Sequence, residues 1–244
     1  MEKDNLVKLN KYLANSGVAS RRSVKELIKN GEVFVNGVKV FGGALKINPE
    51  KDEIKVFDKK IKKNSNVSYI ILNKPSGVVS TTADEKGRTA VTDLVNIKTK
   101  LYPVGRLDAD SIGLILLTNN GELTHKLTHP KFHIPKKYQV LVHGKVSESQ
   151  LSKLRSGIKL KDGMTLPAEV EIVEEFKFTT KLNFTIHEGR NRQIRRMCGA
   201  LDLEVLELKR IGIGSIELGD LETGKSRNLT EEEILSLKKA AKII

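Results

Sequence analysis

Apolar residues at helical spacing predict two short helices near the N-terminus. Leu9 and Leu13 lie four positions apart and share one face of the first helix. Ser20 is a typical N-cap residue for the second helix. The apolar stripe of that helix consists of Val24, Leu27 and Ile28. A glycine suited to the left-handed residue that ends a helix follows each stripe, at Gly17 and Gly31.

The pattern then changes to the alternation that is typical of strands. Val33 and Val35 precede Asn36-Gly37, a strong short-range signal for a hairpin, and the alternation resumes at Val38. Two helices followed by a hairpin are therefore expected to form a small N-terminal unit.

A charged stretch without apolar periodicity ends this unit. Residues 59–66 read Lys-Lys-Ile-Lys-Lys-Asn-Ser-Asn, which is typical of a flexible basic linker. We therefore expect two domains, one over residues 6–64 with this linker at its end and one over residues 66–244.

Strand-like and helix-like segments alternate after residue 66. Continuous apolar runs predict buried strands at 69–72 and 114–117. Further strands are predicted at 138–142, 182–186 and 206–214. Helices are expected from Glu122 to about Leu127, at 151–154 behind Ser147 or Ser149, and at the C-terminus behind a capping box of Thr230 and Glu233. This order predicts an α+β domain with a mixed, largely antiparallel sheet.

The charge of the chain narrows the classes of partner. Its 244 residues include 43 Lys and Arg against 30 Asp and Glu, which gives a net charge of +13 and a pI near 9.7. An imbalance of this size favours RNA or DNA over an anionic membrane surface. Residues 1–65 hold 15 of the basic and 8 of the acidic residues, so the first domain is the more densely basic one.

Features that are absent from the sequence exclude several classes of protein. No apolar run approaches the ~20 residues of a membrane-spanning helix, and the first four residues, Met-Glu-Lys-Asp, do not begin a secretory signal. We therefore expect a soluble, cytoplasmic protein without a membrane partner. Cys198 is the one cysteine, which excludes an internal disulfide and leaves no cysteine pair for zinc.

The segment from Gly105 to Leu114 contains the first candidate for chemistry. Asp108 lies in a turn between charged neighbours, directly ahead of the buried strand at 114–117, so a rigid element would hold its carboxylate. On turn chemistry alone, an Asp in a glycine-flanked turn more often binds its own backbone. We treat Asp108 as a candidate nucleophile, and Asp110 and Ser111 as groups that stabilise the turn.

The second candidate is the arginine-rich segment that follows the strand at 182–186. Four apolar residues at i, i+3, i+4 and i+7 predict the buried face of a helix, namely Ile194, Met197, Cys198 and Leu201. The opposite face would aim the guanidinium groups of Arg192, Arg195 and Arg196 at a common region. A basic helix that only faces solvent is the alternative.

Two arginines in the first domain also invite a functional interpretation. Arg21 and Arg22 lie in the first turn of the second helix, where a cation opposes the helix macrodipole. Stability does not explain them, so we interpret them as contacts to an RNA backbone, with a solvated face as the alternative.

Three histidines form the one candidate for a metal site. His125 and His129 lie four apart, with His133 nearby, and this spacing can bind zinc. No HExxH glutamate or cysteine accompanies them, so we expect no metal there and assign them hydrogen-bonding or RNA-facing roles.

Several segments together closely resemble the RsuA-like family of ribosomal RNA pseudouridine synthases. The main motifs of that family match residues 69–77 (Tyr-Ile-Ile-Leu-Asn-Lys-Pro-Ser-Gly), 105–121 and 188–197 (Glu-Gly-Arg-Asn-Arg-Gln-Ile-Arg-Arg-Met). Lys137-Tyr138 followed by Val140 matches the tyrosine element between them, and residues 9–37 resemble an S4 RNA-binding domain. The resemblance implies an S4 domain over residues 6–64 and a pseudouridine synthase catalytic domain over residues 66–244.

The resemblance also implies roles for individual residues. Asp108 would be the nucleophile, and Tyr138 would stack on the uracil and help to remove the C5 proton. Arg195 would form a bidentate pair with Asp108 that holds the carboxylate ionised and oriented. Contacts to phosphate or base would come from Lys74, Arg106, Lys137, Arg190, Arg192 and Arg196, beside Arg21 and Arg22 in the S4 domain. Lys74 precedes Pro75 in an expected loop, so a solvated lysine is its alternative.

The implied reaction isomerises a uridine: the bond between N1 and C1′ breaks, and the base rejoins the ribose through C5. Asp108 would attack C6 of the base or C1′ of the sugar, and no metal or cofactor is expected because no redox change occurs. By likeness the substrate is large-subunit (23S) rRNA, with 16S rRNA or a tRNA anticodon stem-loop as alternatives, and no obligate protein partner is implied. A non-catalytic ribosome assembly factor and a nucleoside-cleaving hydrolase are the other function classes.

Overall fold

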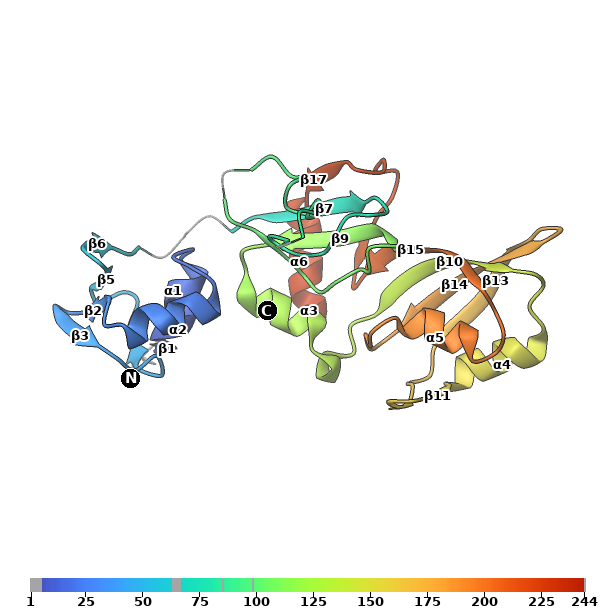
Figure 1. Cartoon of the computed structure of the whole chain (residues 1–244), viewed down its shortest axis with the longest axis horizontal. Helices are drawn as coiled ribbons and strands as arrows, with labels where there is room; N and C mark the ends of the chain where they lie inside the picture. Colours follow the sequence, from blue (N-terminus) through green and yellow to red (C-terminus); the bar gives the residue numbers. More distant parts are fainter. Residues whose placement is uncertain (1–5, 63–66, 85, 98, 244) are drawn as a thin grey trace. The chain divides into compact units, whose positions relative to one another are not determined.

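The computed structural model of the protein describes residues 6–62, 67–84, 86–97 and 99–243. The chain divides into two compact units, with the boundary between Val67 and Ser68 (Figure 1).

The first unit consists of two helices packed with short strands. Its elements are β1 (Val7–Lys8), α1 (Leu9–Asn15), α2 (Arg21–Lys29), β2 (Val33–Val35), β3 (Val38–Val40), β4 (Lys46–Ile47), β5 (Ile54–Val56) and β6 (Lys59–Lys60). Ser20 caps α2 by accepting a hydrogen bond from Ser23 N, as predicted. Asn36 and Gly37 both have positive φ and form the predicted hairpin turn between β2 and β3.

The predicted linker needs correction at its start. Lys59 and Lys60 form β6, which pairs antiparallel with β5, and Lys60 Nζ lies 2.7 Å from Glu53 Oε2. An exposed edge strand needs no apolar periodicity, because backbone pairing and charged side chains are compatible with solvent on the outer side. The polar sequence was therefore ambiguous between strand and linker. Residues 63–66 of the predicted linker lie outside the described residues.

The second unit is built on a nine-stranded sheet with the order β13-β14-β10-β15-β9-β7-β17, to which β16 and β8 add at β15 and β9. Its strands are β7 (Tyr69–Lys74), β8 (Tyr102–Pro103), β9 (Ile112–Thr118), β10 (Lys136–His143), β13 (Glu169–Glu175), β14 (Thr179–Ile186), β15 (Val205–Ile213), β16 (Ile216–Glu217) and β17 (Ser226–Asn228). The pairing of β15 with β9 is parallel, and the other pairings along this order are antiparallel. The predicted α+β class with a mixed, largely antiparallel sheet is confirmed.

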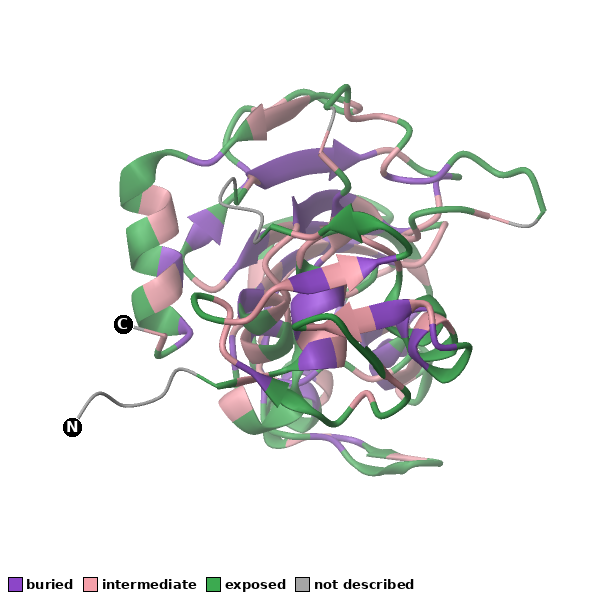
Figure 2. Cartoon of the chain, turned by 90° about the vertical axis from the view of Figure 1, so that its left-hand side faces the viewer, coloured by how far each residue is buried: buried purple, intermediate pink, exposed green. Residues whose placement is uncertain are grey.

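Helices cover both faces of this sheet. They are α3 (Gly121–Thr128), α4 (Glu148–Ser156), α5 (Gln193–Gly199) and α6 (Glu231–Ala240), with a 3-10 turn η1 (Pro130–Phe132) and a separate hairpin of β11 (Lys159–Leu160) and β12 (Gly163–Met164). Ser147 caps α4 and Thr230 caps α6, each with a complete capping box. Figure 2 shows α6, which leads to the C-terminus, with buried and intermediate residues along one side and exposed residues along the other.

Strands β7 and β9 are buried on both faces, as their continuous apolar runs predict. Ile115 and Leu117 of β9 belong to the core that contains α4 and α5. Leu114 and Leu116 belong to a second core with α3 and α6. The chain entering β9 is therefore held from both sides.

Cys198 packs into the first of these cores from α5. Its side chain is fully buried, and burial raises the pKa of the thiol to about 12. This matches the interpretation of Cys198 as a small apolar residue.

Gly113 is required where β9 meets β15. It pairs with Arg210, its φ is +100°, and a Cβ added there would lie 2.3 Å from the carbonyl oxygen of Arg210. We expect Gly113→Ala to lower the free energy of unfolding by about 3 kcal/mol or more, because strained φ and a main-chain clash occur together.

Urea unfolding measures this effect. Gly199→Ala is the matched control, because a Cβ there meets open space and Ala suits a helix better than Gly. A loss below about 1 kcal/mol for Gly113→Ala would show that β15 can shift away from β9 at little cost.

Candidate active site

Several of the residues predicted for chemistry meet at a cavity of about 380 Å³ in the second unit. Its wall comes from the turn at 104–108, the end of α3, β10, the segment at 189–194, and β15. The predicted site residues that line it are Arg106, Asp108, Tyr138, Arg190 and Arg192. A cavity of this size is typical of a small-molecule site.

The Asp108 turn is fixed by the loop that follows β7. Ser80 Oγ donates to Leu107 O over 2.7 Å and accepts from Leu107 N over 2.9 Å. Gly77 N donates to Ala109 O over 2.8 Å. These bonds use the backbone of the turn and not the carboxylate of Asp108, whose side chain is 30 % exposed. The carboxylate is therefore held in place beside the cavity.

Lys74 supports this turn from inside the protein. The prediction that it contacts phosphate or base is therefore wrong in this structure. It is the last residue of β7 and is fully buried. Its Nζ donates to the carbonyl oxygens of Pro75, Val78 and Ala109 over 2.9, 2.8 and 3.2 Å. Burial lowers the pKa of the ammonium to about 8, against the attraction of the carboxylates in the turn. Lys74 has no donor left for RNA.

Two of the predicted arginines converge on Asp110. Arg192 Nη1 and Nη2 donate to Asp110 Oδ1 and Oδ2 over 3.2 and 3.0 Å, and Arg195 Nε lies 3.4 Å from Oδ2. The hydrogen bonds from Arg192 hold the pKa of Asp110 below its usual value. Arg192 Nη1 also lies 3.8 Å from Asp108 Oδ2, so one guanidinium connects the two carboxylates.

The predicted bidentate pair of Arg195 with Asp108 is therefore wrong in this structure. Arg195 contacts Asp110, and its Nη1 donates to Val205 O over 3.0 Å. Arg192 takes the position beside Asp108, because it is the N-cap residue of α5 with a φ of 48°. Helical spacing assumes that both arginines are helical, and it cannot predict where a left-handed cap residue directs its side chain. Asp110, interpreted as a turn-stabilising group, is the carboxylate that both arginines share.

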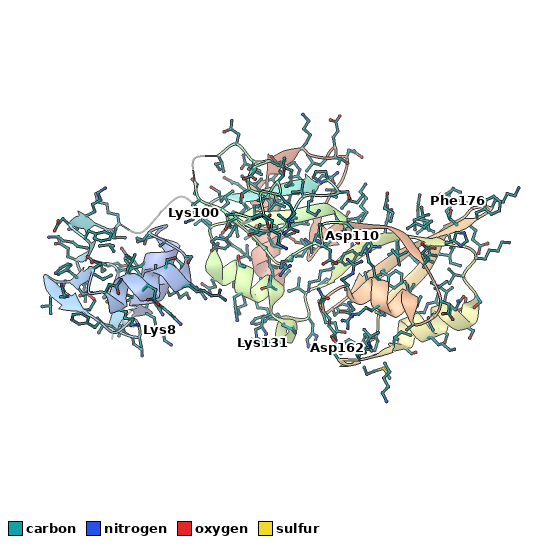
Figure 3. The ribbon with its side chains drawn as sticks, in the orientation of Figure 1. Lys8, Lys100, Asp110, Lys131, Asp162 and Phe176 are labelled. Carbon is teal, nitrogen blue, oxygen red and sulfur yellow. The ribbon has the colours of Figure 1, made fainter. Side chains whose placement is uncertain are left out.

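Arg196 does not join this region. Its Nη1 and Nη2 donate to Asp162 Oδ1 and Oδ2 over 2.9 and 3.1 Å, in the turn between β11 and β12. Figure 3 labels the two acidic partners in different places, Asp110 beside β15 and Asp162 below α5. The predicted convergence of three guanidinium groups therefore holds for Arg192 and Arg195 alone, and Arg196 is not part of the cavity wall.

Arg190 both lines the cavity and is tied to the same hairpin. Its guanidinium donates to the carbonyl oxygens of Asp162, Gly163 and Met164 and to Glu188 Oε2. These bonds fix its position before any ligand binds.

Side-chain alternation along β10 separates two neighbours that the sequence interpretation grouped together. Tyr138 faces the cavity. Lys137 lies on the opposite face of the sheet, where its Nζ donates to Glu217 Oε1 over 2.8 Å. The predicted substrate contact of Lys137 is thus not part of this cavity. Lys136, which shares the face of Tyr138, lines the cavity instead.

Two buried cations at the cavity were not predicted. Lys136 Nζ donates to Ile134 O over 2.9 Å, and burial, together with the positive charge of Arg210, lowers its pKa to about 8. Arg210 Nε donates to Leu114 O over 2.7 Å. The available signal was a basic residue at an inward position of each strand: Lys136 lies two residues before Tyr138, and Arg210 lies two residues after Leu208 in the predicted strand at 206–214.

The remaining predicted contacts lie on the surface. Arg21 and Arg22 are exposed on the first turn of α2, and their contact with RNA stays a prediction.

The rings of His125 and His129 lie 5.1 Å apart and both contact Phe132. Across the described ranges, no group of three or more His, Cys, Asp or Glu is placed to hold a metal ion. No helix in the same ranges is long and apolar enough to cross a membrane.

Known proteins resemble this chain in both units. Residues 68–200 match the family described as RNA pseudouridylate synthase, and residues 7–50 match the S4 domain. The chain is 45% identical over 237 residues to ribosomal large subunit pseudouridine synthase B of Bacillus subtilis (strain 168), with 96% of each chain covered. It is 36% identical over 236 residues to dual-specificity RNA pseudouridine synthase RluF of Escherichia coli (strain K12), covering 96% of this chain and 79% of that protein.

A solved structure extends the similarity to three dimensions. The crystal structure of a pseudouridylate synthase superposes with a TM-score of 0.69 at 34% sequence identity, covering 95% of this chain and 99% of that one.

Proposed function

The chain belongs to the RNA pseudouridylate synthase family, and from this membership we propose that it isomerises one uridine of large-subunit ribosomal RNA to pseudouridine, with Asp108 as the nucleophile. The resemblance of its motifs to RsuA-like synthases is confirmed, as is the S4 domain ahead of the catalytic domain. The observation that carries the proposal is that Asp108 and Tyr138, which both lie in the segment that matches the family, line one cavity.

The geometry suits the roles that we assign to these residues. The carboxylate of Asp108 is partly exposed beside the cavity, and the Arg192 guanidinium places a positive charge 3.8 Å away. Tyr138 offers an aromatic ring on β10 for a uracil to stack on, and its hydroxyl is the group that we assign to removal of the C5 proton.

The substrate must bring a single base into this cavity. Extruding a uridine from its stack costs roughly a few kcal/mol, and contacts to the surrounding RNA offset that cost. Arg21 and Arg22 on the S4 domain and Arg106 at the cavity are the groups that we assign to such contacts. We place the reaction in the cytoplasm, where ribosomal RNA is available to a protein of this kind.

Pseudouridine mapping tests the proposal. Total RNA from a strain that lacks the gene is incubated with the purified protein or with buffer, and pseudouridine is mapped at nucleotide resolution in rRNA and tRNA. We expect one new pseudouridine, in 23S rRNA, that is absent from the buffer control.

The other outcomes separate the alternatives. A new pseudouridine in 16S rRNA or in a tRNA anticodon stem-loop would keep the reaction and change the substrate. Release of free uracil would indicate a nucleoside-cleaving hydrolase. Tight rRNA binding without any modification would favour a non-catalytic assembly factor and overturn the proposed reaction.

A further inference from the structure

The wall of the cavity contains a buried guanidinium with unused hydrogen-bonding capacity. Arg210 is 3% exposed, and its Nε donates to a strand carbonyl. Its Nη2 is sealed from solvent and has no hydrogen-bond partner within the described part of the chain. Buried polar atoms in folded proteins are nearly always paired. An unpaired donor at a cavity therefore points to a ligand that supplies the acceptor.

The sheet register places Arg210 among the residues of the proposed reaction. On β15 it pairs with Tyr138 of β10 on one side and with Gly113 of β9 on the other. Arg210, Tyr138 and Asp108 all line the same cavity. Ser111 also lines this cavity, and its Oγ is a second buried polar atom without a partner among the described residues. A ligand that reaches Arg210 here also lies beside Asp108 and Tyr138.

The same wall carries an excess of positive charge. Lys136 is 9% exposed and lines the cavity, and Arg210 is close enough for its charge to disfavour the protonated form of Lys136. Glu188 is the carboxylate that acts on Lys136, but its oxygens already accept three hydrogen bonds from other residues. Lys136 and Arg210 are therefore neighbouring buried cations, and the carboxylate of Glu188 is already used by other hydrogen bonds. Such a pair suits a ligand oxygen that carries negative charge.

We propose that Arg210, supported by Lys136, forms an oxygen-binding subsite that holds a carbonyl oxygen of the flipped uracil and stabilises the negative charge of the detached base. The proposal rests on the proposed function and adds a recognition group to it. A phosphate of the RNA backbone is the other source of such an oxygen.

The chemistry of the isomerisation provides the charge that this subsite needs. When the bond between N1 and C1′ breaks, its electron pair stays with the base, and the negative charge is shared by N1 and the carbonyl oxygens O2 and O4. C1′ is left as an oxocarbenium ion or as an ester of the Asp108 carboxylate. The base then turns, and C5 bonds to C1′, which consumes the cation or displaces the carboxylate. C5 then loses its proton and N1 takes one up. A fixed cation at O2 or O4 stabilises the charged base more than the neutral uridine, and so accelerates the reaction.

Arg210→Met tests the subsite, because methionine keeps much of the volume and removes the charge. With the RNA that the wild-type protein modifies, we expect the single-turnover rate to fall about 100-fold while the affinity for RNA is unchanged. Arg210→Lys keeps a charge and should retain more activity. Arg155→Met is the matched control, because Arg155 Nε also donates to a strand carbonyl, Val170 O at 2.8 Å, but lies outside the cavity wall.

Sulfur substitution in the RNA identifies the atom that is bound. RNA with 2-thiouridine or 4-thiouridine at the target position replaces O2 or O4 by a weaker acceptor. One of the two substitutions should slow the wild-type protein, and the same substitution should slow Arg210→Met and Arg210→Lys less. Circular dichroism checks whether Arg210→Met folds. If it does not fold, the comparison of the wild type with Arg210→Lys still tests the subsite.

Three results would overturn the subsite. Equal rates for Arg210→Met and wild type would remove it and leave the proposed function in place. Weaker RNA binding with a shallower salt dependence, at an unchanged rate for bound RNA, would make Arg210 a phosphate contact. If the wild-type protein forms no pseudouridine in any RNA, the proposed function fails, and the subsite fails with it.

Discussion

Replacing Asp108 by Asn is expected to abolish pseudouridine formation, with a single-turnover rate at least about 10⁴-fold below that of the wild-type protein. The amide has nearly the same shape as the carboxylate but no nucleophilic charge. The turn itself should persist, because the bonds from Ser80 and Gly77 that hold it are made to the backbone of Leu107 and Ala109. Affinity for RNA should therefore be unchanged.

Rapid-quench assays on the mapped RNA, together with a filter-binding measurement, separate these two quantities. Asp220→Asn is the matched control, because Asp220 is exposed and lies outside the cavity wall. An Asp108→Asn protein that keeps its activity would place the nucleophile elsewhere. Loss of both activity and binding would indicate that the substitution disturbs the fold of the turn.

Lys74→Met should slow the reaction about 100-fold, because the turn that carries Asp108 loses its internal anchor and a displacement of about 1 Å at a reacting group costs that much. The Nζ bond to Ala109 O is the direct link to the residue beside Asp108. RNA affinity should not change, since Lys74 is fully buried. A lysine that contacted phosphate would show the reverse pattern, with weaker binding and a normal rate for bound RNA.

The free energy of unfolding of Lys74→Met should also differ from that of the wild type in its dependence on pH. The pKa of Lys74 is about 8 in the folded protein and near 10.5 when the group is unperturbed. Between these values the unfolded chain binds more protons at residue 74 than the folded chain. The stability of the wild type relative to Lys74→Met should therefore rise with pH across this window, by at most about 3 kcal/mol, and be constant below it.

Urea titrations at several pH values from neutral to alkaline measure this difference. Lys153→Met, on the exposed side of α4, serves as the control and should show no trend. A relative stability that falls with rising pH would mean that the three carbonyl groups favour the charged form more strongly than burial disfavours it.

Much of the fold can be predicted from residues that are close to one another in the sequence. The caps at Ser20, Ser147 and Thr230 each need a side chain and a backbone N–H that are close in sequence, so their prediction requires no tertiary information. The turn at Asn36-Gly37 is equally local. Continuous apolar runs likewise indicated burial on both faces for β7 and β9, because no polar residue interrupts them.

The candidate site was less predictable, because its contacts join distant parts of the chain. Motif order predicted a shared site for Asp108 and Tyr138, and both residues line the same cavity. It could not predict that Lys74 turns inward to three carbonyl groups, since a lysine before a proline is usually solvated. The exchange of Arg195 for Arg192 beside Asp108 depends on one backbone angle at the start of α5. Lys136 could have been predicted, since period-two alternation alone places it with Tyr138.

The sealed thiol of Cys198 makes this protein convenient for attaching probes. Maleimides and iodoacetamides react with thiolates, and the chain's one cysteine is fully buried with a pKa raised to about 12. The native chain should therefore be inert to these reagents at neutral pH. A cysteine introduced at an exposed position of the S4 domain would be the one reactive thiol, so a fluorophore could be attached there without first removing a native residue.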